Sequence, residues 1–130
     1  MFNVCTRRKL LQTMGAEMNL NILGTEYEII EKTADEAVEM KNADGWHSNN
    51  FPVIYIEKEM YKSCEFNSEG EREKYAMARR KIVLRHEIIH AFFRQSGIEH
   101  TGDLSDEGRI HFFALQFPKM LKAFEQVGAI

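Results

Sequence analysis

Residues 82–93 read IVLRHEIIHAFF, an apolar run that is interrupted only by Arg85, His86, Glu87 and His90. A helix that is apolar nearly all round is usually buried, so this run predicts a helix in the core of the fold. Two histidines and a glutamate placed there without partners would cost several kcal/mol in lost solvation. A bound metal ion would offset that cost, and the run therefore predicts a metal site on a buried helix.

Local signals mark both ends of this helix. Ser68-Glu69-Gly70-Glu71 is a capping-box pattern, in which Ser68 caps the helix and Glu71 bonds back toward the cap. Gly97 suits the left-handed position that closes a helix. We therefore expect a helix from residue 69 to about residue 96, followed by a loop over residues 98–102.

A second helix is predicted from about residue 104 to residue 127, with Asp103 or Ser105 as its cap. Its apolar residues recur at intervals of three and four, which marks the face expected to pack on the core: Ile110, Phe113, Ala114, Phe117, Leu121 and Phe124. Pro118 is expected to kink or split this helix near Phe117, because proline lacks an amide donor.

The preceding segment predicts a short sheet. Residues 20–23 and 27–30 read as a strand pair or one bent strand, and residues 51–56 form the clearest strand, with Pro52 at its start or on an edge. Residues 33–41 are expected to form a short helix capped by Thr33, and residues 42–45 a turn, with His47 exposed just beyond it.

Together, these elements predict one α+β domain over residues 1–130, in which two helices pack on an antiparallel sheet of about three strands. Residues 1–18 are expected to form a short helix or a mobile N-terminal arm.

The composition of the chain excludes several function classes. With 130 residues, 44% of them hydrophobic, and a net charge of -3, it offers no general attraction to nucleic acid or to an anionic membrane. No apolar run approaches the ~20 residues that span a bilayer, and the charged N-terminus has no apolar core after it, so we do not expect it to be a secretory signal. Cys5 and Cys64 lack metal-ligand spacing and are expected to be reduced thiols, so we expect the protein to act in the cytoplasm.

His86 and His90 lie four residues apart and therefore share one helix face, from which both rings can reach the same ion. Glu87 projects at an adjacent angle, where it can meet a water held by that ion. Two nitrogen ligands with a base beside the water are the arrangement of a zinc hydrolase. The alternative is a pair of hydrogen-bonded core histidines without a metal.

A catalytic zinc site usually takes a third protein ligand. The candidates that follow are His100, Asp103, Asp106, Glu107 and His111. Glu107 is preferred, because the residues three, four and seven positions further on belong to or border the core face of the second helix. His111, one turn later, is either the third ligand instead or a hydrogen-bond partner that orients the ring of His86 or His90.

The segment HEIIH at 86–90, followed by DEGRIHFFA at 106–114, resembles the small zincin-type metallopeptidases of the ImmA/IrrE kind, and is most similar to short phage- and prophage-encoded versions. The resemblance covers roughly residues 20–125, and its specific motifs lie within residues 82–117. It implies that His86, His90 and Glu107 bind one Zn²⁺ and that Glu87 is the general base. Two positions depart from the family pattern: His111 stands where Asn or Asp is common, and Ile89 where a small residue often precedes the second histidine.

These roles predict a metallo-endopeptidase. Glu87 would take a proton from the attacking water and return it to the leaving amine. The strand residues 53–56 are the best candidate for a free edge that pairs with an extended substrate, a protein or peptide such as a repressor or a host protein. The second oxyanion donor stays open among Arg109, His100 and His111.

Two other classes of function compete with this interpretation. A metal-dependent nuclease is disfavoured because the chain is not basic and no third histidine follows His90 within a turn or two. A regulatory binding protein of phage type, such as an anti-repressor, would keep the zinc site and act mainly by protein contact.

Overall fold

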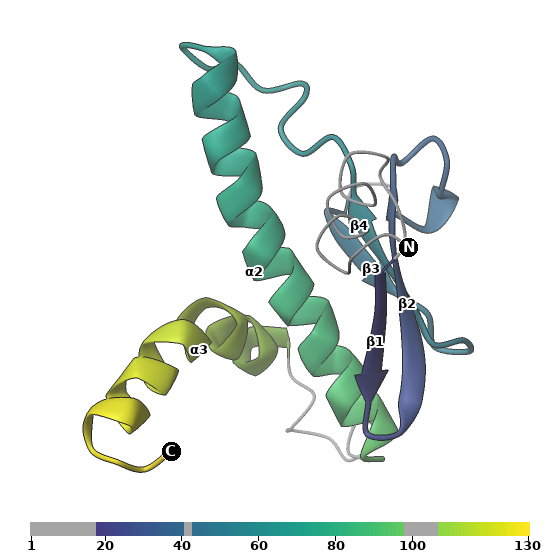
Figure 1. Ribbon diagram of the computed structural model, residues 1–130. Helices are drawn as coiled ribbons and strands as arrows, with labels where there is room; N and C mark the ends of the chain where they lie inside the picture. Colours follow the sequence, from purple (N-terminus) through teal and green to yellow (C-terminus); the bar gives the residue numbers. More distant parts are fainter. Residues whose placement is uncertain (1–17, 41–42, 98–106) are drawn as a thin grey trace, which may run out of the picture.

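The computed structural model describes residues 18–40, 43–97 and 107–130, and its fold is α+β (Figure 1). The elements in chain order are β1 (Met18–Ile22), β2 (Thr25–Lys32), the 3₁₀ turn η1 (Val38–Met40), β3 (Gly45–His47), β4 (Val53–Glu57), α2 (Glu69–Gln95) and α3 (Glu107–Gln126). The predicted class and both predicted helices are confirmed. The sheet differs from the prediction, because it has four strands and is mixed. The interpretation of residues 1–18 lies outside the described residues except for Met18, which begins β1.

β1 and β2 form an antiparallel hairpin, as the two apolar segments predict. Leu23 and Gly24 make the turn, with φ angles of 51° and 91°. A two-residue turn with positive φ at both positions matches the right-handed twist of the strands it joins. The side chain of Asn21 supports the turn by accepting a hydrogen bond from the Gly24 amide at 3.0 Å.

β4 lies inside the sheet, whose strand order is β1-β2-β4-β3. It pairs in parallel with β2 and antiparallel with β3. The prediction of a free edge along residues 53–56 is therefore wrong, because β3 covers that side of the strand. Pro52 lies immediately before β4, which agrees with the predicted position at the start of the strand. Its carbonyl accepts a hydrogen bond from the Glu28 amide at 3.0 Å.

The core lies between one face of the sheet and α2. Tyr27 and Ile29 alternate with exposed residues along β2, and Ile54 and Ile56 alternate with half-buried residues on β4. These side chains form one buried cluster with residues of α2 that include Val83 and Ala91. The C-terminal half of α2 lies nearest the strands (Figure 1), which places the histidine motif beside the sheet.

The ends of α2 agree with the sequence signals. The Ser68 hydroxyl accepts a hydrogen bond from the Glu71 amide at 3.1 Å, and Gly97 has a φ of 77° just beyond the helix. The Glu71 carboxylate bonds to the Asn67 amide at 3.0 Å instead of the amide of Ser68 itself. The expected full burial of the helix is only partly met. Its buried residues are Val83, Glu87, His90 and Ala91, whereas Phe92 is exposed.

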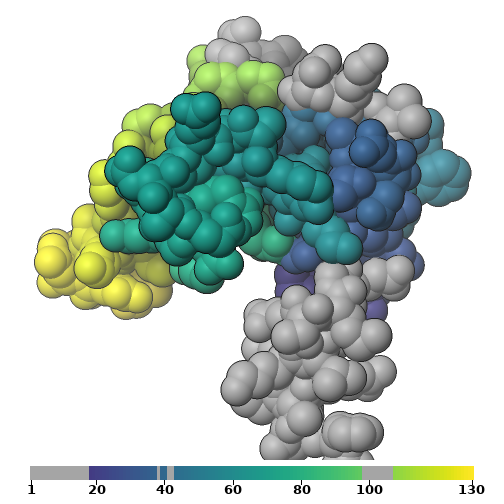
Figure 2. Space-filling view, turned by 90° about the horizontal axis from the view of Figure 1, so that it is seen from above, coloured from purple at the N-terminus to yellow at the C-terminus, as the bar shows by residue number. Residues whose placement is uncertain are grey.

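α3 packs on the side of α2 away from the strands, as the space-filling view in Figure 2 also shows. Pro118 lies inside α3 without splitting it, so of the two predicted outcomes near Phe117 the split does not occur. In an α-helix, Pro118 would leave the carbonyl of Ala114 without its usual donor four residues on. Nε of Arg85 from α2 donates to that carbonyl at 2.6 Å. The hydrogen bond from Arg85 thus gives the Ala114 carbonyl a donor in place of the amide that Pro118 lacks, and it also joins α2 to α3.

The predicted core face of α3 is buried only in its first turns. Ile110 and Ala114 are fully buried. Phe113, Phe117 and Phe124 continue the same face and are 37%, 49% and 40% exposed. The prediction that this whole face packs on the core is therefore only partly met, because the three phenylalanines are exposed, whereas Leu121 is half-buried.

Smaller expectations are met in part. The helix predicted over residues 33–41 is reduced to η1, preceded by a turn in which the Thr33 carbonyl accepts bonds from the amides of Glu36 and Ala37 at 3.0 Å. Cys64 is an exposed free thiol, and Cys5 lies outside the described residues. Within the described residues, no helix combines the length and apolar character that crossing a membrane requires.

Candidate metal centre

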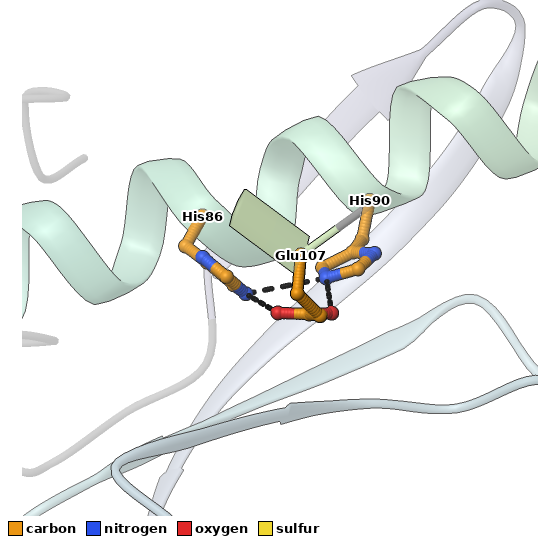
Figure 3. A group of neighbouring side chains, drawn as sticks. All are labelled: His86, His90 and Glu107. Carbon is orange, nitrogen blue, oxygen red and sulfur yellow. Dashed lines mark hydrogen bonds and ion pairs between the residues drawn. The ribbon is translucent and has the colours of Figure 1, made fainter. Parts of the chain in front are cut away.

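Two helices bring His86, His90 and Glu107 together (Figure 3). The Nε2 atoms of His86 and His90 lie 3.2 Å apart, as expected for residues one turn apart on α2. Glu107 is the first residue of α3, and its carboxylate oxygens lie 3.0 Å from Nε2 of His86 and 2.6 Å from Nε2 of His90. One ligand atom from each residue lies within 4.8 Å of the other two, and the group could hold a metal ion.

The donor set and its spacing fit a small divalent cation. Ligand atoms at ordinary zinc bond lengths of about 2.0–2.2 Å in a tetrahedron lie about 3.3 Å from one another. The 3.2 Å between the two Nε2 atoms is close to that value. Two imidazole nitrogens and one carboxylate oxygen also leave room for a fourth, non-protein ligand.

The site is closed on one side and open on the other. His90 is buried against β3 and the core, whereas the Glu107 side chain is 70% exposed. An ion held between them would therefore face solvent on the α3 side. That accessibility suits a centre that exchanges water for a substrate.

Burial lowers the pKa of His90, and the neighbouring His47 and His86 act in the same direction. The carboxylates of Glu107 and Glu87 oppose this shift and raise the pKa of His90, each by less than burial or His47 lowers it. A lowered pKa favours the neutral ring, which is the form of histidine that binds a metal. The environment of His90 is thus suited to a ligand.

Glu87 is buried at 6% exposure, immediately beside the ligand pair. Its Oε2 atom lies 2.6 Å from Nδ1 of His47. An ionised carboxylate can only accept hydrogen bonds, so Nδ1 of His47 carries the proton and donates it. This contact provides the buried carboxylate with the partner that its desolvation requires.

His47 is the site residue that the sequence interpretation missed. It was expected to be exposed beyond a turn, but it lies in β3 with its ring stacked on that of His90, at 4.3 Å between centroids and 24° between planes. β3 has only three residues, too few for an alternating pattern, and contains glycine and histidine. The only sequence signal was a histidine next to Trp46, ahead of a clear strand with which a short strand could pair.

Gly45 allows β3 to approach α2 closely. A Cβ atom at this position would lie 2.5 Å from Cγ1 of Val83 and 3.1 Å from Cγ of Glu87. Gly45→Ala is therefore expected to lower the free energy of unfolding by about 1–3 kcal/mol through overpacking, measured by chemical denaturation.

Gly70→Ala is a matched control for the Gly45 substitution. A Cβ atom at Gly70 would meet only Ser68 Oγ, at 4.0 Å, and alanine favours a helix by up to about 1 kcal/mol over glycine. We expect the two substitutions to change stability in opposite directions. Equal stability of Gly45→Ala and the unaltered protein would contradict the close approach of β3.

The other predicted site residues are not part of the three-ligand group. The ring centroid of His111 lies 6.3 Å from that of His86, and His111 makes no hydrogen bond to His86 or His90. Arg109 is exposed on α3. The candidates His100, Asp103 and Asp106, with the predicted caps Asp103 and Ser105, lie outside the described residues.

Comparison with protein-family models, with curated proteins and with solved structures found no match. The resemblance to metallopeptidases of the ImmA/IrrE kind therefore stays a prediction from the motifs. The function is therefore inferred from the geometry of His86, Glu87, His90 and Glu107.

Proposed function

We propose that this chain is a zinc-dependent metallopeptidase of the ImmA/IrrE kind that hydrolyses peptide bonds in a protein or peptide substrate. The observation that carries the proposal is the convergence of His86, His90 and Glu107 on one point, with the carboxylate of Glu87 beside them. Two imidazoles and one carboxylate are a donor set that catalytic zinc sites use.

Each residue has a distinct role in the proposed reaction. His86, His90 and Glu107 hold the ion, which when bound lowers the pKa of a water toward ~7 and polarises the substrate carbonyl. Glu87 accepts the proton of the attacking water on its carboxylate and delivers it to the amine that leaves. The exposed side of the site, next to Glu107, gives the substrate its approach.

Removal of the metal tests this function directly. Protein treated with a chelator and then dialysed is expected to lose hydrolysis of an unfolded protein substrate, and added Zn²⁺ is expected to restore it. The cleavage products are measured by mass spectrometry. Magnesium is the control, because it prefers oxygen ligands and octahedral geometry. Undiminished cleavage by metal-free protein would contradict the proposal.

A second candidate function is a binding protein that acts by contact, such as a repressor-directed regulator. The exposed apolar face of α3 favours it, because Phe113, Phe117 and Phe124 lie on one side of a helix that extends past α2. Contiguous exposed apolar surface often marks a site of protein interaction. In this case the metal group would stabilise the junction of α2 and α3, and catalysis would not be required.

A further inference from the structure

The two carboxylate oxygens of Glu87 have different surroundings. Oε2 accepts the hydrogen bond from Nδ1 of His47 at 2.6 Å. Within the described residues, His47 meets Oε2 and not Oε1. Oε1 lies close to Gly45, where a Cβ atom would be only 3.2 Å away, so a side chain at position 45 would crowd this oxygen.

His47 also contacts the ligand pair through its ring. Its imidazole stacks on that of His90, so one side chain touches both the glutamate and a candidate metal ligand. A group that is fixed to both can set the distance between them. The strand pairing of His47 with Ile54 fixes the backbone from which the ring projects.

From these contacts we propose that His47 is a positioning residue for the general base, a role that rests on the proposed peptidase function. By holding Oε2, it fixes the orientation of the Glu87 carboxylate, which would accept the proton of the water that attacks the substrate. The hydrogen bond restricts rotation of a carboxylate that would otherwise sample several orientations. Such restriction matters because catalysis requires reacting groups to be held within fractions of an ångström.

Two substitutions at position 47 separate this role from simple packing. His47→Asn keeps an N–H donor close to the place of Nδ1, whereas His47→Leu keeps a similar volume without a donor. Trp46→Phe is the matched control. Trp46 is the neighbour of His47 on β3, but its side chain points to the other face of the sheet and stacks on Tyr55, at 5.3 Å between ring centroids. All variants are compared as zinc-loaded full-length protein, with zinc content measured for each.

Steady-state kinetics on a peptide that the unaltered protein cleaves give the first readout. His47→Leu is expected to lower kcat about 10- to 100-fold with little change in KM, because a misplaced reacting group costs rate more than binding. His47→Asn is expected to recover most of kcat, and Trp46→Phe to leave it unchanged. Equal kcat in His47→Leu and the unaltered protein would overturn the positioning role while leaving the peptidase function intact.

A spectroscopic signature gives a readout that does not depend on turnover. The proton on Nδ1 of His47, observed by NMR, is expected to shift upfield in Glu87→Gln, because a hydrogen bond to a neutral amide is weaker than one to a carboxylate. An unchanged resonance would overturn the His47–Glu87 contact itself. Failure of the unaltered zinc-loaded protein to cleave any peptide would overturn the peptidase function and the positioning role of His47 with it, even if the resonance shifts.

Discussion

Glu87→Gln is expected to abolish peptide hydrolysis while leaving the bound metal and the fold in place. General acid–base catalysis contributes about 10²- to 10⁴-fold to a rate, and an amide cannot accept the proton of the attacking water. The substitution preserves shape, which matters for a side chain at 6% exposure. The amide oxygen can still accept the hydrogen bond from His47, so the buried donor keeps a partner.

The matched control for this experiment is Glu73→Gln. Glu73 is an exposed glutamate of the same helix, remote from the site, and its substitution is expected to change neither activity nor metal content. Retained hydrolysis in Glu87→Gln would remove Glu87 from the role of base. A biological effect that survives Glu87→Gln, with hydrolysis lost, would favour the contact function over the peptidase.

The second large effect is expected in metal content. The unaltered protein should bind close to one Zn²⁺ per chain, and His86→Ala and Glu107→Ala should each lower the affinity more than about 100-fold. Substituting residues that merely orient a ligand already costs about 10- to 100-fold, so losing a ligand costs more. Zinc is measured by elemental analysis after dialysis, and the affinity by competition with a chelating dye.

His111→Ala is the control for the ligand variants. His111 lies on α3 one turn after Glu107 and contacts His86 only through its ring edge, so zinc content should stay near that of the unaltered protein. Full zinc retention in Glu107→Ala would contradict the assignment of Glu107 as a ligand. Loss of zinc in His111→Ala with retention in Glu107→Ala would transfer the third position to His111.

Local signals predicted the parts of this molecule whose physical cause is local. The ends of α2 follow from Ser68 and Gly97, whose effects act within one turn of the helix. The hairpin of β1 and β2 follows from two short apolar segments joined at Gly24. The candidate ligand pair His86 and His90 follows from helical spacing, and the approach of Glu107 to it follows from the apolar periodicity of the next helix.

The missed features depend on pairing between distant segments. Nothing within residues 53–56 indicates that β3 covers their edge, because a central and an edge strand can share the same composition. The role of His47 depends on the same pairing, which brings it to Glu87, 40 residues away along the chain. Periodicity likewise identified the apolar face of α3. How much of that face is buried depends on how many turns of α3 contact α2, which periodicity does not indicate.

The contact between Arg85 and Ala114 has a consequence for how the surface of α3 can vary. Arg85 binds a main-chain oxygen, so the bond is indifferent to the identity of the side chain at most α3 positions. The outward residues, such as Phe117 and Phe124, can therefore diverge among related chains, or be exchanged by design, without shifting Glu107. Partner choice and hydrolysis would then be separable traits carried by a single helix.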